Sequence, residues 1–154
     1  MNRVYLSLGS NLGNKRAHLL QAIRHIAGKI GVFSAISSVY ETKPWGFESE
    51  NDFLNMMVCV ETQLSPIEIL SITQSIEKEM GRRQKTNHSY CDRIIDIDLI
   101  ACNDLILDIE KLQLPHPLFH RRRFVLEPFN EIAPDYVHPV LKKKVKELLS
   151  ELVD

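Results

Sequence analysis

The spacing of apolar residues predicts a chain that alternates between strands and helices. Where hydrophobic residues recur at every second position we expect a strand, and where they recur at every third or fourth position we expect a helix. The strands predicted in this way cover residues 4–8, 32–42, 53–62 and 94–102.

Two helices are expected between these strands. The first has apolar residues at helical spacing over 19–30, and Asn11 or Asn14 is expected to cap its start. The second begins at Ser65-Pro66-Ile67-Glu68, a capping box with proline at the first helical position, and its apolar stripe ends at Met80.

Further helices are predicted near 122–132 and over about 141–152. The resulting order, βαββαβ followed by extra C-terminal helices, is typical of a ferredoxin-like α+β sandwich. Helices would then cover one face of an antiparallel sheet and leave the other available for a ligand. A doubly wound parallel sheet fits less well, because two predicted strands follow one another with no helix between them. Since no repeat or linker divides the chain, 1–154 is expected to be a single domain.

Composition narrows the class of protein. The chain has 154 residues, 44% of them hydrophobic and 25% charged, and a formal net charge of −1, which favours neither a nucleic-acid nor a membrane partner. Its three cysteines, Cys59, Cys91 and Cys102, have no metal-binding spacing and are an odd number, so a disulfide framework is not expected. No signal-like start or long apolar run is found. We therefore expect a cytoplasmic protein and favour a monomer.

The candidate chemistry lies in the last predicted strand. On a strand, Asp96 and Asp98 project from the same face about 6.5–7 Å apart, while Ile95, Ile97 and Leu99 point into the core. Two neighbouring carboxylates repel each other unless a cation lies between them, and Mg²⁺ typically combines one or two carboxylates with waters and substrate phosphates. The alternative is an exposed strand face with two solvated aspartates.

Basic residues on both sides of this pair favour the metal interpretation. They are Arg82, Arg83, Lys85 and Arg93 before it, and Arg121, Arg122 and Arg123 after it. Guanidinium groups match phosphate oxygens, so the pattern predicts a Mg²⁺-dependent enzyme that moves a phosphate-containing group from ATP. Two other positions stay open at this level: His116 suits a phosphate or ribose donor as well as a polar loop residue, and Trp45 is more simply explained by packing onto the sheet.

Several short motifs occur together in a recognisable order. They are Ser7-Leu8-Gly9-Ser10-Asn11-Leu12-Gly13, Ser38-x-Tyr40-x-Thr42-x-Pro44-Trp45-Gly46, Phe53-Leu54-Asn55, Gln74-x-x-Glu77, Gly81-Arg82, Arg93-x-x-Asp96-x-Asp98-Leu99, Leu114-Pro115-His116-Pro117 and Arg122-Arg123-Phe124-Val125-Leu126-x-Pro128. With them the chain resembles the 6-hydroxymethyl-7,8-dihydropterin pyrophosphokinase family, from Tyr5 to about Pro134.

The resemblance implies transfer of pyrophosphate from ATP to the pterin hydroxymethyl group, with release of AMP, in folate biosynthesis. It implies that two Mg²⁺ ions are held by Asp96 and Asp98, with Arg82 and Arg93 close to the transferred phosphates. The pterin would be bound by Thr42, Pro44, Trp45, Phe53, Asn55 and Phe124. ATP would be bound by Gln74, Glu77, Arg82, Arg93, His116 and Arg122.

One segment departs from the family pattern. Where the family usually has Arg-Trp-Gly-Pro-Arg, this chain has Ser89-Tyr90-Cys91-Asp92-Arg93, and either Arg83 or Lys85 could supply a second cation nearby. Two other functions remain as alternatives. A metal-dependent phosphohydrolase could use the same aspartates, whereas a non-catalytic ferredoxin-like module would bind a ligand such as RNA on its open face.

Overall fold

A five-stranded antiparallel sheet forms the centre of the molecule. The structure is a computed structural model that describes residues 1–43, 51–81 and 93–153. The sheet strands are β1 (Asn2–Ser10), β2 (Val32–Ile36), β3 (Tyr40–Thr42), β4 (Phe53–Thr62) and β5 (Asp96–Cys102). Their order is β2-β4-β1-β5, and β3 pairs with β4 on the same edge as β2.

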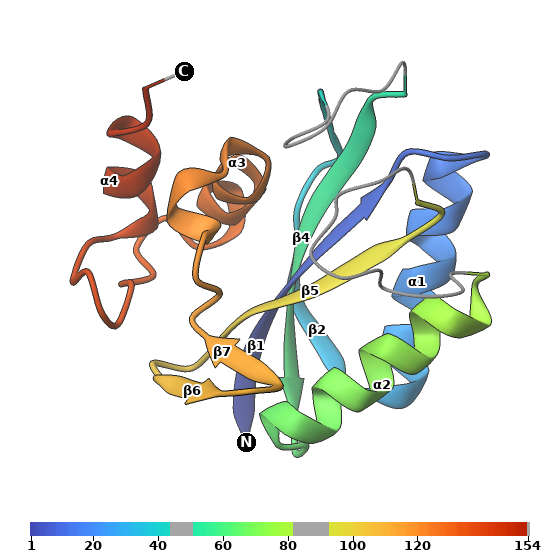
Figure 1. The fold of residues 1–154 in the computed structure, drawn as a ribbon, viewed down its shortest axis with the longest axis horizontal. Coiled ribbons are helices and arrows are strands. Elements are labelled where there is room, and N and C mark those ends of the chain that lie inside the picture. Colours follow the sequence, from blue (N-terminus) through green and yellow to red (C-terminus); the bar gives the residue numbers. More distant parts are fainter. Residues whose placement is uncertain (44–50, 82–92, 154) are drawn as a thin grey trace.

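Helices lie on both sides of this sheet, as Figure 1 shows. They are α1 (Lys15–Lys29), α2 (Pro66–Glu79), α3 (Arg123–Ile132) and α4 (Val145–Ser150). A small hairpin of β6 (Leu107–Ile109) and β7 (Leu112–Leu114), followed by the 3₁₀ turn η1 (Phe119–Arg121), connects β5 to α3. Strand order and helix placement confirm the predicted ferredoxin-like α+β sandwich with additional C-terminal helices.

The first hydrophobic core lies between the sheet and the α1–α2 layer. Alternate residues of β1 and β4 point into it, including Leu6, Leu8, Met56 and Val58, all at most 3% exposed. The capping box predicted at the start of α2 is present, with Ser65 and Glu68 bonded reciprocally. No helix in the described part of the chain has the length and apolar character that crossing a bilayer requires.

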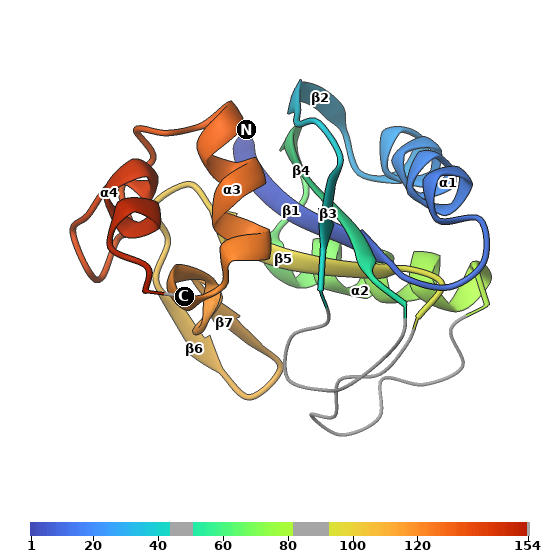
Figure 2. The same cartoon turned by 90° about the horizontal axis from the view of Figure 1, so that it is seen from above.

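A second core lies on the opposite face, so only part of the face that was expected to be available for a ligand remains free of the packing of α3. There α3 packs over β4, and Val125, Leu126 and Phe129 are buried against Met57. Figure 2 shows α3 on the side of the sheet opposite α1. Within 1–43, 51–81 and 93–153, this core extends over only part of the face, and the rest of the face holds the polar residues described below.

The strand predicted over 32–42 is divided into β2 and β3. At the break, Ser37 N–H donates to Met57 O (2.9 Å), but the Ser37 hydroxyl accepts from Met57 N–H (2.9 Å) in place of a backbone carbonyl. A serine side chain that competes for a backbone donor in this way interrupts regular pairing.

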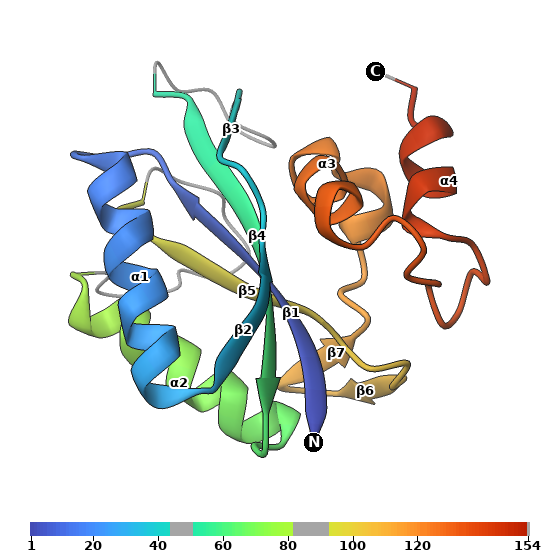
Figure 3. The same ribbon diagram turned by 180° about the vertical axis from the view of Figure 1, so that it is seen from behind.

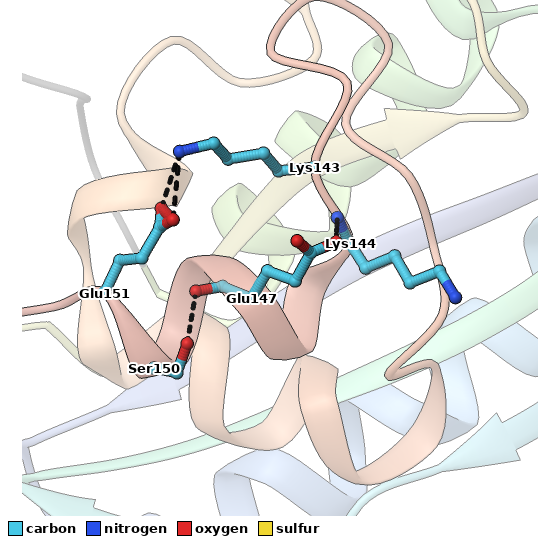
Figure 4. Close-up of polar contacts among 5 residues, drawn as sticks. All are labelled: Lys143, Lys144, Glu147, Ser150 and Glu151. Atoms are coloured by element: carbon cyan, nitrogen blue, oxygen red, sulfur yellow. Dashed lines mark hydrogen bonds and ion pairs between the residues drawn. The ribbon is translucent and has the colours of Figure 1, made fainter.

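The last predicted helix, 141–152, is shortened to α4. Its expected first turn is a loop in which Lys142 has a positive φ of 60°, so the helix can begin only afterwards. The Glu147 carboxylate accepts from Lys144 N–H (3.1 Å) at the new start, and Lys143 pairs with Glu151 (2.9 Å), as Figure 4 shows.

Candidate active site

The open face of the sheet changes from apolar to polar along its strands. At one level, Tyr5 of β1 lies between Cys59 of β4 and Ala101 of β5, and all three belong to the second core. Four residues further along β1, Gly9 lies between Asn55 and Asp96. Because α3 packs over the apolar level, the polar level is left as the candidate site.

Asp96 and Asp98 share this polar face, as strand alternation predicts. Ile97, between them, and Leu99 point into the first core and are 2% and 5% exposed. A bulge at Ile100 shifts the register, since Tyr5 pairs with Ala101 whereas Leu6 pairs with Leu99. The bulge lies beyond the aspartates, so both keep their place on the open face.

The donor set of the aspartate pair fits a hard cation. Asp96 lies opposite Gly9, which has no side chain, and Asp98 lies opposite the small Ser7. In the ranges that the structure covers, no three His, Cys, Asp or Glu side chains gather to hold a metal ion. Two carboxylates completed by waters and phosphate oxygens are the usual ligands of Mg²⁺ in nucleotide sites.

Arg93 lies beside this pair. Its Nη1 is 3.0 Å from Asp96 Oδ1, and the two side chains are only 10% and 20% exposed. This brings two predicted catalytic residues together. A guanidinium at this position can exchange the carboxylate for a phosphate group. The oxygens of either group match the planar fork of N–H donors that the guanidinium presents.

The position of Arg93 depends on Asn11, a role that the sequence did not reveal. Asn11 is 2% exposed; its N–H donates to Arg93 O (3.0 Å), and its Oδ1 accepts from Arg93 N–H (2.6 Å). The side chain also donates from Nδ2 to Asn51 O (3.4 Å). The helix cap expected at Asn11 or Asn14 is Asn14, whose Oδ1 accepts from Ala17 N–H (3.2 Å).

Glu77 supports the aspartate strand from the other face. The residue is 4% exposed, and its Oε2 accepts from Ile97 N–H (2.8 Å). Because β5 is an edge strand, half of its N–H groups point away from β1 and need another partner. Gln74, one turn earlier on α2, is exposed. Contacts of both residues with ATP stay predictions.

Three of the predicted pterin residues meet at the end of β4. Thr42 of β3 pairs with Phe53, and the buried Asn55 donates from Nδ2 to the Thr42 hydroxyl. Gly9 is a further member of this group that the sequence did not reveal. A Cβ on Gly9 would lie 2.9 Å from Asn55 Oδ1 and 3.5 Å from Phe53 Cδ1, so only glycine leaves Asn55 where it is. The alternation of apolar residues along β1 could have indicated which face of the sheet Gly9 lies on. It could not have indicated that Asn55 is its neighbour there.

The other predicted residues that the structure describes come from the segment after β5. His116 N–H donates to Ile100 O (2.8 Å), and its Nδ1 accepts from Leu118 N–H (3.2 Å). The neutral ring therefore carries its proton on Nε2, which can donate to a ligand. Arg122 is 4% exposed, and burial lowers its pKa to about 10, so it stays charged at neutral pH. Its guanidinium carbon lies 5.6 Å from the centre of the Phe124 ring.

Several predicted positions lie outside the described residues. They are Pro44, Trp45, Arg82, Arg83, Lys85 and the Tyr90-Cys91-Asp92 segment. Their assignments stay predictions.

Comparisons of the sequence with known proteins all indicate the same family. Residues 5–134 match the family described as 7,8-dihydro-6-hydroxymethylpterin-pyrophosphokinase (HPPK). A 2-amino-4-hydroxy-6-hydroxymethyldihydropteridine pyrophosphokinase of Porphyromonas gingivalis is 45% identical over 139 residues, covering 88% of this chain and 93% of the relative. One of the same description from Aquifex aeolicus is 38% identical over 151 residues, covering 98% and 92%.

Among solved structures, the Plasmodium falciparum HPPK-DHPS with pteroate superimposes with a TM-score of 0.78 at 17% identity, over 97% of this chain. The chain spans 44% of that longer protein, and the likeness concerns the fold.

Proposed function

The chain belongs to the 7,8-dihydro-6-hydroxymethylpterin-pyrophosphokinase family, and from this premise we propose that it transfers pyrophosphate from ATP to 6-hydroxymethyl-7,8-dihydropterin. The products are AMP and the pterin diphosphate, an intermediate of folate biosynthesis. The family match over residues 5–134 carries the proposal. The polar level of the sheet, where Asn55, Gly9 and Asp96 lie side by side, supports it.

Asp96 and Asp98 are proposed to hold two Mg²⁺ ions that also contact the triphosphate. Their shared face and their small neighbours on β1 support this assignment. Bound Mg²⁺ would neutralise charge on the triphosphate and make the β-phosphorus more electrophilic.

The residues of the chain are proposed to position the two substrates. Asn55 and Thr42 offer donors and acceptors to the amide edge of the pterin, and Phe53 and Phe124 offer faces for stacking. The pterin hydroxymethyl oxygen forms a bond to the β-phosphorus, the bond from that phosphorus to the oxygen it shares with the α-phosphate breaks, and the hydroxyl proton is released. Alignment of these atoms accounts for most of the expected acceleration.

Cationic and donor groups on the other side are proposed to bind the nucleotide. Arg93 and Arg122 would contact phosphate oxygens, and the Nε2–H of His116 would donate to a phosphate or ribose oxygen. Arg122 is buried but stays charged at neutral pH, and its planar guanidinium matches phosphate oxygens, which supports this role. Arg82, Gln74 and Glu77 complete the proposed nucleotide side.

The reaction is tested by incubating the protein with ATP, Mg²⁺ and 6-hydroxymethyl-7,8-dihydropterin and identifying the nucleotide product. AMP that forms only when pterin is present supports the proposal. ADP, or turnover without pterin, would overturn it and would instead indicate a phosphohydrolase.

A cytoplasmic, monomeric, single-domain enzyme with only small-molecule substrates is part of the same proposal. Cys59 and Cys102 are buried free thiols, which suits a reducing compartment. Size-exclusion chromatography with light scattering tests the monomer directly.

A further inference from the structure

Glu131 on α3 links the helix to the strand segment that precedes the pterin residues. Its two carboxylate oxygens each accept from Ser38 N–H at 3.0 Å, and Oε2 also accepts from the Ser38 hydroxyl (3.1 Å). Oε1 accepts from the Tyr40 hydroxyl (2.6 Å). Ser38 and Tyr40 belong to the motif that leads to Thr42, and the proposed function gives neither of them a task.

The strand side of this link is continuous with the proposed pterin site. Tyr40 pairs with Asn55, and Thr42 pairs with Phe53, all on one face of the β3–β4 ribbon. Tyr40 and Thr42 are two residues apart, so their side chains lie about 6.5–7 Å apart along β3. The contact with Glu131 is therefore one strand repeat away from the predicted pterin edge.

The helix side is continuous with the site as well. Phe124 and Glu131 are seven residues apart on α3, which places them on the same face of the helix, two turns and about 10.5 Å apart. Figure 2 shows α3 running alongside β3, and Figure 3 shows the helix next to the β3–β4 ribbon. The helix face and the strand face thus oppose each other. Glu131 and Tyr40 are in contact at one end, and Phe124 and Thr42 lie toward the other end.

We infer that Glu131 is a positioning residue that sets the separation between the two walls of the pterin site, α3 with Phe124 and the β3–β4 ribbon with Thr42 and Asn55. The inference rests on the proposed function, because it assigns a task within the pterin site. A carboxylate that accepts charge-assisted hydrogen bonds from three donor groups fixes a distance more sharply than apolar packing, which tolerates sliding.

The same contacts keep this carboxylate ionised. The hydrogen bond from Tyr40 is the largest cause that lowers the pKa of Glu131, and the bond raises the pKa of Tyr40 to about 12. The link is therefore intact throughout the neutral range. Helix α3 has a second, apolar anchor, because Val125, Leu126 and Phe129 are buried in the second core.

Three variants and one control test the inference by their KM values for 6-hydroxymethyl-7,8-dihydropterin and for ATP. Glu131→Ala and Tyr40→Phe are expected to raise the pterin KM, on the order of tenfold for the former, with the ATP KM within about twofold of wild type. Glu131→Gln should recover much of the loss, because its amide oxygen still accepts from Ser38. The control is Glu127→Ala, one turn earlier on α3, where the partner is Arg123 of the same helix (3.4 Å).

The outcomes separate the inference from its premise. If wild type forms AMP in a pterin-dependent manner but Glu131→Ala leaves the pterin KM unchanged, or raises both KM values equally, the positioning role is wrong. If wild type forms no pterin-dependent AMP, the proposed function fails and the inference fails with it. Tyr40→Phe removes a single hydroxyl, so it reports on the link even if Glu131→Ala lowers stability.

Discussion

Arg93 and Asp96 form an ion pair in which Nη1 and Oδ1 are 3.0 Å apart, three residues from one another at the start of β5. The pair joins the phosphate-binding and metal-binding halves of the proposed site in one contact. Asn11 holds the backbone of Arg93 in turn, so the guanidinium is placed by a residue 82 positions away. The arrangement is set before any substrate binds.

Replacement of Arg93 tests its proposed contact with the transferred phosphates. Arg93→Ala should lower kcat by about 10²–10³-fold, the usual loss when one donor to developing charge is removed. Arg93→Lys keeps the charge but loses the planar fork, so it should recover only part of the rate. Steady-state AMP formation measures both. A kcat for Arg93→Ala within threefold of wild type would contradict the role.

Asn11 and Asn14 allow the placement of Arg93 to be separated from the stability of the same loop. Asn14→Ala removes the α1 cap and should cost about 1 kcal/mol of unfolding free energy with kcat unchanged. Asn11→Ala leaves Arg93 N–H without its acceptor and should cost about 1–3 kcal/mol and also lower kcat severalfold or more. Urea unfolding and AMP formation are measured for each. Equal kcat values in the two variants would refute the positioning of Arg93 by Asn11.

The sequence predicted those features that depend on near neighbours along the chain. Strand alternation placed Asp96 and Asp98 on one face, the predicted strand 53–62 coincides with β4, and the capping box marked the start of α2. Each follows from a repeat of two residues or from contacts within one helical turn.

Features that depend on distant contacts could not be predicted. The division of β2 from β3 rests on a hydroxyl of Ser37 that meets Met57, and the role of Asn11 rests on Arg93. How much of the open face is covered depends on where α3 packs. That position is determined by contacts of α3 with distant residues in the second core, and the hydrophobic pattern within the helix does not specify them. Nothing in the local sequence distinguishes these side chains from ordinary turn residues.

Gly9 offers a test of the pterin side of the site. Gly9→Ala would place a methyl group 2.9 Å from Asn55 Oδ1 and force that buried amide away from Thr42. The pterin KM should rise at least about tenfold, with little change in the ATP KM, because a site built to hydrogen-bond its ligand discriminates strongly when one partner moves.

The matched control is Gly28→Ala in α1. A Cβ there meets nothing within 4 Å, so the substitution should stabilise the protein by about 0.5–1 kcal/mol and leave both KM values unchanged. If Gly9→Ala binds pterin as well as Gly28→Ala does, Gly9 does not shape the pterin site.

Stability should fall as the pH drops below neutral, because of a histidine pair near α4. His138 is 5% exposed, stacks on Phe119 (5.1 Å between ring centres) and accepts at Nδ1 from Val140 and Leu141 N–H (3.2 and 3.1 Å). His120 lies 5.9 Å away, between ring centres. Burial is the main cause that lowers the pKa of each histidine from the ordinary value of 6.5. The charge of His120 lowers the pKa of His138 further, and the charge of Arg121 lowers that of His120.

A lowered histidine pKa means that the unfolded chain binds protons first. The stabilisation is therefore complete above about pH 6.5 and is lost as the pH falls below it, by at most about 1.4 kcal/mol per pH unit for each histidine. Urea unfolding between pH 7.5 and 5.0 measures this slope, in a range above the ordinary pKa of the carboxylates. His138→Gln should be less stable at pH 7.5, because glutamine cannot reproduce the stacking of the buried imidazole on Phe119. Its free energy of unfolding should nevertheless depend less steeply on pH. An unchanged slope would show that His138 does not carry the pH dependence.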